Sequence, residues 1–322
     1  MNQEFAQRQA QVLELLGIIS AFAETKQKTL VFLGGSAVQV ILKQPQRLSI
    51  DLDIFYDGTP DELITAIPKE YVVTKKKSRD QDLFEFYETM KNNALVKLDI
   101  SRFALIKNDH PYEKKKITIL GKNQVVNIAT SDYLLASKFS SISIGTIGRK
   151  PDRSDFQINF LKDVFDANCL INDFGLTPKT FEYFNHIVNT QNTLRKTNYT
   201  SSESVQSAIK ALLDSSKKDK GTISKGALQS FSQYLVARKN IKQPEYWELS
   251  YRLAAYLQCF KKTDPLNEID LIKNKASQYA NKQIIEQCEK ELIEKGFAKV
   301  EAHELKILSP KALIYLNEAI EK

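Results

Sequence analysis

Hydrophobic residues recur along the chain with two different periods. Within residues 3–24 the apolar positions follow the three- and four-residue spacing of an amphipathic helix. A short apolar run from Val31 to Leu33 ends in two glycines and leads into a second helical pattern, so it predicts a strand, a tight turn and a helix. From Leu48 to Ile54 the period changes to two, which is typical of a strand with one buried and one polar face.

More strand-like segments follow before the pattern becomes helical. We expect strands at residues 71–75, 83–89, 95–101, 116–120 and 124–128. Because these segments follow one another closely, a largely sequential sheet with antiparallel neighbours is expected. A helix that begins at Thr130 or Ser131 and a second helix over about 154–170 come next.

The remainder of the chain has helical periodicity alone. The expected helices cover residues 177–196, 202–216, 224–239, 244–262, 268–295 and 309–321. No repeat period is present in them, which favours a helical bundle over a solenoid. The pattern therefore predicts an α+β fold, with a mixed-sheet domain in residues 1–172 and an all-helical domain in residues 173–322.

Composition narrows the class of protein. A chain of 322 residues with 42% hydrophobic content can form two domains with proper cores. The longest apolar run near the start, Leu15 to Ala23, is about half of a membrane span, and no basic segment precedes it, so a cytoplasmic protein is expected. Three cysteines and three histidines lack the spacing of a disulfide framework or a zinc site.

Two carboxylates occupy the polar face of the alternating strand. Asp51 and Asp53 are two residues apart, about 6 to 7 Å along an extended chain, so both can reach one point. Two acids this close repel each other unless a cation lies between them. Mg²⁺ suits such a place, because it binds one or two carboxylates and completes its shell with water and phosphate oxygens.

The preceding turn, Gly34-Gly35-Ser36, offers the complement to these acids. Glycines let the backbone approach a ligand closely, and the free N–H groups at the start of the next helix attract anions such as phosphates. Each feature alone has an ordinary explanation, an exposed polar strand edge for the acids and a simple turn for the glycines. Their joint occurrence at this spacing favours a site.

This combination resembles a known superfamily. Gly-Gly-Ser followed about a dozen residues later by Arg-x-Ser-x-Asp-x-Asp is similar to the polymerase-β-like nucleotidyltransferases, and within them to the AbiEii/MenT-type toxins of toxin–antitoxin pairs. The resemblance implies that residues 1–172 form a nucleotidyltransferase domain. It also implies that Gly34, Gly35, Ser36, Arg47 and Ser49 contact the nucleotide.

The resemblance also implies a third acid on a neighbouring strand. Asp99 lies in a second alternating segment, with Lys97 and Ser101 on the same face. By the resemblance, Asp99 would bind metal together with Asp51 and Asp53, or take a proton from the acceptor. The alternative is an ordinary exposed strand aspartate.

A distal motif completes the resemblance. In the toxin family a helix with a lysine, a basic loop and a helix that commonly reads Arg-Asp-x-Tyr-Asp follow one another. Here Lys138 stands on the first helix, while Lys162 and Phe165 replace the arginine and tyrosine around Asp163. The resemblance implies that Lys138 neutralises triphosphate charge, that Asp163 fixes this lysine or contacts the nucleotide, and that Lys162 lies at the nucleotide.

The loop between these two helices carries Arg149, Lys150 and Arg153, three cations that could meet an RNA backbone. With lysine clusters elsewhere and a formal charge of +7, they suggest either solvated surfaces or a phosphate-backbone footprint.

The expected activity is Mg²⁺-dependent transfer of a nucleoside monophosphate from an NTP to an acceptor hydroxyl. Two Mg²⁺ ions are the expected cofactors, the tRNA 3′ end is the favoured acceptor, and a cognate antitoxin is an expected partner. Modification of a small molecule such as an antibiotic, modification of a protein hydroxyl, and a catalytically inactive nucleotide-binding module are the alternatives.

Overall fold

The computed structural model divides the chain into two compact units. The first unit contains residues 1–134 and 234–237, and the second contains residues 135–233 and 238–322. The described residues are 3–76, 84–101, 111–119, 122–152, 154–217, 223–237 and 240–320. The division lies inside helix α5 (Ser131–Ile142), whereas the sequence pattern suggested a boundary after residue 172. Compactness thus groups the helices of the distal motif with the C-terminal helices.

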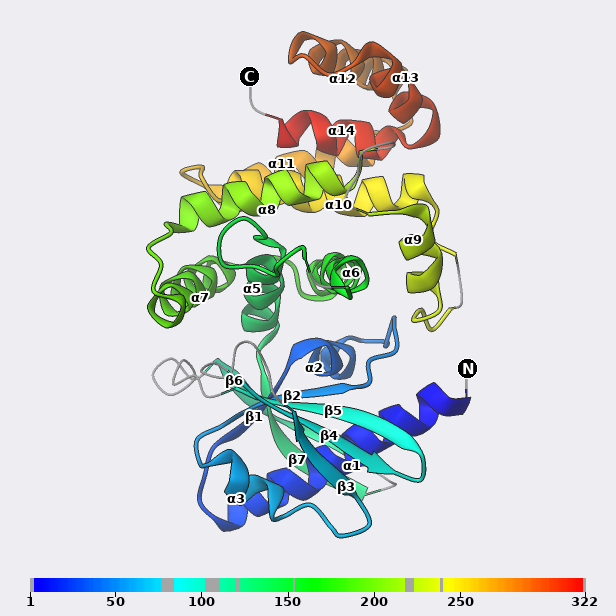
Figure 1. Cartoon of the computed structure of the whole chain (residues 1–322). Coiled ribbons are helices and arrows are strands. Elements are labelled where there is room, and N and C mark those ends of the chain that lie inside the picture. Colours follow the sequence, from blue (N-terminus) through cyan, green and yellow to red (C-terminus); the bar gives the residue numbers. More distant parts are fainter. Residues whose placement is uncertain are drawn as a thin grey trace. The chain divides into compact units, whose positions relative to one another are not determined.

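A seven-stranded mixed sheet forms the centre of the first unit (Figure 1). Its strands are β1 (Leu30–Leu33), β2 (Asp51–Tyr56), β3 (Val72–Lys76), β4 (Phe84–Lys91), β5 (Ala94–Ser101), β6 (Tyr112–Ile119) and β7 (Lys122–Ala129). They are ordered β3-β4-β5-β2-β1-β7-β6. Four pairs of sequential strands (β1 with β2, β3 with β4, β4 with β5 and β6 with β7) are antiparallel neighbours, as expected, but β2 pairs with β5 and β1 with β7 in parallel. The predicted α+β fold with a mixed sheet is confirmed.

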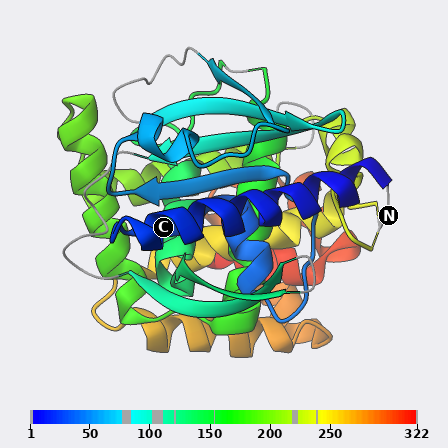
Figure 2. The same ribbon diagram turned by 90° about the horizontal axis from the view of Figure 1, so that it is seen from below.

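One face of the sheet is formed by fully buried apolar residues. Phe32, Ile54, Ile100 and Ile128 form one row across four neighbouring strands, and each is 0% exposed. Helix α1 (Gln3–Thr25) runs across the sheet (Figure 2) and buries its own apolar stripe there. Because side chains alternate along a strand, the residues between those of this row point to the opposite face.

Helix α2 (Gly34–Ile41) follows β1 without an intervening loop, and α3 (Pro60–Ile64) follows β2 after a short turn. A distant segment closes the region between α2 and β2. Arg47 forms an isolated antiparallel bridge with Leu235. The amide of Leu48 donates to the carbonyl of Tyr234 at 2.6 Å, and the amide of Val236 donates to the carbonyl of Gln46 at 3.0 Å. Residues 234–237 therefore belong to the first unit although the chain on both sides of them belongs to the second.

Helices make up the second unit. After α5 these are α6 (Phe156–Phe174), α7 (Pro178–Arg195), α8 (Ser201–Ser215), α9 (Lys225–Ser232), α10 (Gln243–Cys259), α11 (Pro265–Ser277), α12 (Lys282–Glu294), α13 (Lys299–Leu308) and α14 (Pro310–Ala319). Helix α10 is the most central of them, because it packs against α6, α8, α11 and α14. Its buried residues lie on all sides, which is typical of a helix surrounded by others.

Several predicted boundaries were wrong. The single helix expected over 268–295 is two helices, α11 and α12, because the Asn281 side chain accepts a hydrogen bond from the Gln283 amide at 3.0 Å and starts a new helix. Helix α13 was not predicted, α9 ends at Ser232 and not at residue 239, and β6 begins at Tyr112 and not at residue 116.

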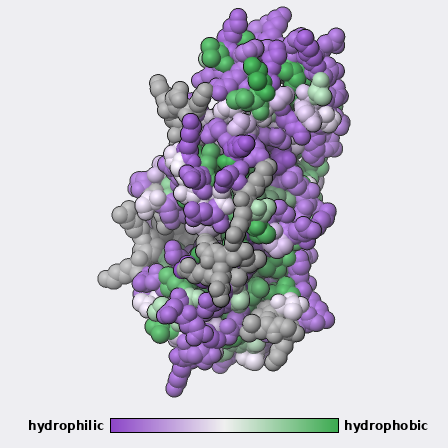
Figure 3. All heavy atoms as spheres, turned by 90° about the vertical axis from the view of Figure 1, so that its right-hand side faces the viewer, coloured by the Kyte–Doolittle hydropathy of each residue, from purple (hydrophilic) through white to green (hydrophobic). Residues whose placement is uncertain are grey.

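The face drawn in Figure 3 is predominantly hydrophilic, with smaller hydrophobic areas between the polar ones. Among the described residues, no helix is both long and apolar enough to cross a membrane.

Candidate functional site

The first glycine of the Gly-Gly-Ser turn lies against a carboxylate. Gly34 opens α2 with φ +68°, a left-handed conformation that residues with a side chain rarely adopt. A Cβ atom at this position would overlap with the carboxylate of Asp53. Gly34 is therefore required twice, for its backbone angle and for the space that Asp53 occupies.

The second glycine lies against the other end of the second motif. A Cβ atom on Gly35 would overlap with the guanidinium of Arg47 and lie 3.2 Å from the hydroxyl of Ser49. Arg47 is only 2% exposed, and its Nη1 donates to the carbonyl of Leu48 at 3.0 Å. Arg47 and Ser49 thus pack against the start of α2, and both residues are largely buried.

The serine completes this set of contacts. The hydroxyl of Ser36 donates to the carbonyl of Asp51 at 2.5 Å. Each residue of Gly34-Gly35-Ser36 therefore contacts a residue of the Arg-x-Ser-x-Asp-x-Asp segment. The residue before α2 is Leu33, whose side chain makes no capping hydrogen bond, so the first amides of α2 depend on other partners, and an anion is one kind that they can bind.

The three predicted acids lie on one face of the sheet. Asp53 pairs in register with Asp99 across the parallel strands β2 and β5, and Asp51 pairs with Lys97 in the same way. Neighbouring strands lie about 4.8 Å apart, so Asp53 and Asp99 are direct neighbours. All three acids are half-buried, on the face opposite the Phe32 row. Lys97, which was not predicted as a site residue, is exposed beside Asp51.

These acids provide oxygen ligands of the kind that Mg²⁺ prefers. Within the described residues no three His, Cys, Asp or Glu side chains are gathered closely enough to hold a metal ion by themselves. This arrangement still fits Mg²⁺, because that ion needs only one or two carboxylates when water and phosphate oxygens complete its shell. The assignment of Asp51, Asp53 and Asp99 as metal ligands stays a prediction.

The distal motif forms a buried cluster of charges within the second unit. The Nζ of Lys138 on α5 lies 2.9 Å from the Oδ1 of Asp163 and 2.9 Å from the Oδ2 of Asp166, both on α6. Asp163 also accepts a hydrogen bond at 2.6 Å from the Nε of Arg149. The side chains of Lys138, Asp163 and Asp166 are 8%, 2% and 0% exposed, so these ions stabilise one another without much help from water.

The cluster keeps Asp163 ionised. Burial raises the pKa of this carboxyl group, but the charges of Arg149 and Lys138 and the hydrogen bonds that they donate lower it by more, to about 2. Asp163 consequently holds both cations at neutral pH.

The remaining predicted residues have different surroundings. Lys162 is half-buried and Lys150 is exposed, whereas Arg149, predicted to bind RNA, is bonded to Asp163. Arg153 lies outside the described residues. Sequence reasoning missed Asp166 as a partner of Lys138, although its position three residues after Asp163 places both acids on one side of α6.

Replacing Gly34 should lower the free energy of unfolding more than replacing another glycine with a positive φ. Gly296 has φ +87° and no atom within 4 Å of its missing Cβ, so Gly296→Ala should lower the free energy of unfolding by about 1–2 kcal/mol. Gly34→Ala adds the overlap with Asp53, which should cost about 1–3 kcal/mol more. Urea unfolding followed by circular dichroism measures both, and equal losses would refute the close contact with Asp53.

Because of Asp163, the free energy of unfolding should depend on pH in the acid range. Its folded pKa of about 2 is below the ordinary value of 3.8, so its stabilising contribution is complete above about pH 4 and is lost as the pH falls through 2. Unfolding free energies measured from pH 5 to pH 2 should therefore fall more steeply in the wild type than in Asp163→Asn. Parallel curves would contradict the ionised, doubly paired carboxylate.

No curated protein sequence matches the chain. One similar solved structure is that of an antigenic nucleotidyltransferase-like protein from Paracoccidioides brasiliensis, which shares 13% sequence identity. That match covers 57% of this chain and 90% of the other chain, with a TM-score of 0.36.

The family comparison covers more than half of the chain. The model of the nucleotidyl transferase AbiEii toxin family, type IV toxin–antitoxin system, matches residues 18–235. The match contains both motifs and ends at Leu235, the residue that bridges to Arg47. The family expected from the motifs is thus confirmed, and the chain belongs to the AbiEii toxins, the nucleotidyltransferases of type IV toxin–antitoxin systems.

Proposed function

We propose that this nucleotidyltransferase uses Mg²⁺ to transfer a nucleoside monophosphate from an NTP to the 3′ end of tRNA. In this proposal it acts in the cytoplasm as the toxin of a toxin–antitoxin pair, with a cognate antitoxin as its partner. The observation that carries the proposal is the set of contacts between Gly34-Gly35-Ser36 and the strand that bears Asp51 and Asp53. These contacts join an anion-binding helix start to a pair of carboxylates.

The residues of the first unit have two proposed roles, phosphate binding and metal binding. The first amides of α2 would donate hydrogen bonds to phosphate oxygens, since the first amides of a helix have no partner within the helix and Leu33 does not cap them. Asp51 and Asp53 would hold Mg²⁺, and Asp99, the register partner of Asp53, would join them or act as a base. When bound, the metal supplies positive charge that stabilises the attacking and leaving oxygens.

The chemistry is an in-line displacement at the α-phosphorus. The acceptor hydroxyl oxygen forms a bond to that phosphorus, the bond from the phosphorus to the oxygen bridging the α- and β-phosphates breaks, and pyrophosphate leaves. The hydroxyl proton would pass to a carboxylate, and we assign this role to Asp99, the register partner of Asp53. In the second unit, Lys138 and Lys162 are the residues that we assign to nucleotide binding, and Asp163 would hold Lys138 in position.

The charge of the chain supports RNA as the acceptor. The formal net charge is +7, and Lys150 lies exposed in the loop between the two helices of the distal motif. A polyanionic acceptor needs such cations along its path, whereas a small uncharged acceptor does not.

The proposal is tested by incubating the protein with each of the four α-labelled NTPs, Mg²⁺ and total cellular RNA. Label that enters tRNA at its 3′ end supports the proposal, and omission of one NTP at a time identifies the donor. Label on the protein itself, on another protein or on an added aminoglycoside would instead favour the corresponding alternative acceptor. Absence of transfer with every NTP and acceptor would favour an inactive nucleotide-binding module.

Removing either acid of β2 should stop transfer. Asp51→Ala and Asp53→Ala should each lower the rate by about 100-fold or more, because charge stabilisation by a held metal is worth several kcal/mol. Asp57→Ala is the matched control, since Asp57 follows the same strand but pairs with Lys28 at 3.7 Å. Initial rates of label incorporation decide the matter, and a wild-type rate in either acid variant would exclude the metal assignment.

Neutralising the basic loop should weaken transfer to RNA more than NTP binding. Arg149 is left intact because it is bonded to Asp163, so the variant is Lys150→Ala combined with Arg153→Ala. Two fewer phosphate contacts should reduce the slope of log affinity for tRNA against log salt by roughly 1–2. The control is Lys282→Ala with Lys290→Ala on α12, whose side chains are 85% and 72% exposed. Identical salt dependence in both double variants would argue against this loop as an RNA contact.

A further inference from the structure

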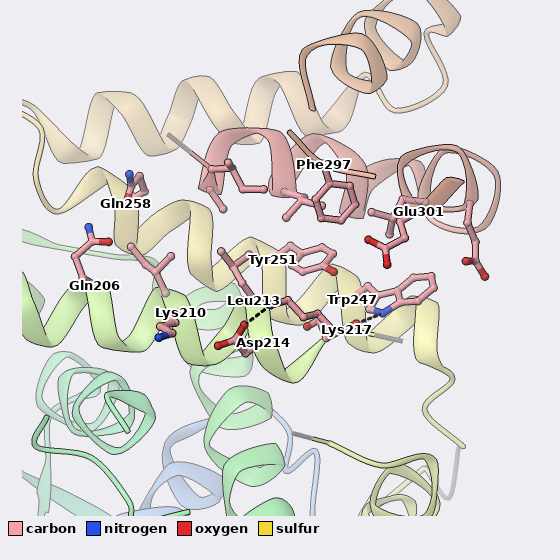
Figure 4. Close-up of a pocket in the computed structure, with 17 residues that line it drawn as sticks. Gln206, Lys210, Leu213, Asp214, Lys217, Trp247, Tyr251, Gln258, Phe297 and Glu301 are labelled. Atoms are coloured by element: carbon pink, nitrogen blue, oxygen red, sulfur yellow. Dashed lines mark hydrogen bonds and ion pairs between the residues drawn. The ribbon is translucent and has the colours of Figure 1, made fainter. Parts of the chain in front are cut away.

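A cavity of about 420 Å³ lies among helices α8, α10, α13 and α14 of the second unit (Figure 4). This volume is within the range of sites that hold small molecules. The cavity is distinct from the charge cluster of α5 and α6. Three of its four helices lie beyond residue 235, where the family match ends. Most of the cavity is therefore formed by residues outside the matched region.

The walls of the cavity are mainly aromatic and aliphatic. Trp247 and Tyr251 on α10 face Leu213 on α8, with Phe297 and Leu305 on the side of α13. The indole N–H of Trp247 already donates to the carbonyl of Ser216 at 2.9 Å. A ligand could therefore pack against the indole ring of Trp247, but its N–H group is already used as a donor.

The cavity is elongated along α10. Trp247 and Gln258 lie toward opposite ends of it in Figure 4, eleven positions apart on one helix. At 1.5 Å per residue this separation is about 16 Å. An extended molecule fits such a space better than a compact one.

One polar group in the wall lacks a partner. Gln258 is 5% exposed, and its Oε1 is buried without a hydrogen-bond partner within the part of the chain that the structure describes. A buried carbonyl oxygen left in this state is costly, and native structures normally satisfy it. A ligand that carries a hydrogen-bond donor would supply the missing partner.

The charged residues that line the cavity have both signs. Lys210 and Lys217 lie on the side of α8, where Lys217 pairs with Asp214 at 2.6 Å, and Glu301 and Glu304 lie on α13. Since neither sign dominates among these residues, the cavity has no strong preference for an anion or for a cation. These properties together favour an uncharged ligand.

We propose that this cavity binds an uncharged, elongated and mainly apolar small molecule that carries a hydrogen-bond donor at the end nearest Gln258. The site is independent of the proposed transfer reaction, because none of the residues assigned to nucleotide, metal or RNA lines it. Its failure in the test below would leave the proposed function untouched.

The chain contains a single tryptophan, and Trp247 lies in this cavity, so the full-length protein reports on its own site. The probe is N-phenyl-1-naphthylamine, an uncharged aromatic amine with one N–H donor. Titration should give saturable binding of one probe per chain, with quenching of Trp247 emission by energy transfer in step with the rise in probe fluorescence.

Two glutamine variants test the polar end of the site. Gln258→Leu removes the acceptor and should raise the dissociation constant by about 3- to 10-fold, the usual worth of one hydrogen bond. Gln191→Leu is the matched control, because the Oε1 of Gln191 is also buried without a partner but does not line this cavity. Its dissociation constant should equal that of the wild type.

A third variant tests the space itself. Leu213→Trp fills the middle of the cavity and should abolish binding, read from the probe's own fluorescence after circular dichroism has shown an intact fold. If Leu213→Trp does not fold, the two glutamine variants decide the question. Non-saturable binding, binding without Trp247 quenching, or equal affinities of Gln258→Leu and Gln191→Leu would each overturn the proposal.

Discussion

The closeness of helix α2 to strand β2 is the constraint on which the site depends. Two residues without side chains, Gly34 and Gly35, leave room for the carboxylate of Asp53 and the guanidinium of Arg47. Any larger residue would push the helix start away from the acids. The same closeness places anion-attracting amides next to carboxylates that repel anions, and the divalent cation of the proposed function would resolve this conflict. Under that proposal, a metal–triphosphate complex would match the region better than either part alone.

A second constraint acts within the helical unit. Lys138, Asp163, Asp166 and Arg149 form an ionic cluster that is mostly withdrawn from water. Burying such ions is costly, and removing one partner leaves the others uncompensated, a loss of about 3–5 kcal/mol in comparable clusters. Substitution of Lys138 or Asp163 therefore changes the packing of α5 against α6 as well as any contact with a nucleotide. Measurements of activity on such variants need a measurement of stability beside them.

The sequence pattern predicts what is local and misses what is distant. Gly34 and Asp53 could be recognised because a turn residue and a period-two strand leave their mark within a few positions. Periodicity reports that a face is buried, but not which element buries it. The parallel pairing of β1 with β7 and the bridge from Arg47 to Leu235 join segments that are distant in the sequence, so periodicity could not predict them.

The same limit explains the other differences between the predictions from the sequence and the structure. Asp166 was overlooked because its role requires knowing that α5 lies beside α6. The cavity near Gln258 is built from helix faces that each look like ordinary core in sequence. The break between α11 and α12 depends on one asparagine cap and not on a glycine or proline, the usual signals of a helix end.

The return of residues 234–237 to the first unit has a consequence for how the protein is made. A ribosome releases the chain from its N-terminus, so the sheet and both motif segments emerge long before Tyr234 and Leu235 do. Until then the backbone groups of Gln46 and Leu48 lack the partners they have in the finished fold. A nascent or prematurely terminated chain that stops before Tyr234 thus carries every acid of the site without the segment that bridges to Arg47. For a toxin, this order of synthesis delays completion of the site until most of the chain exists.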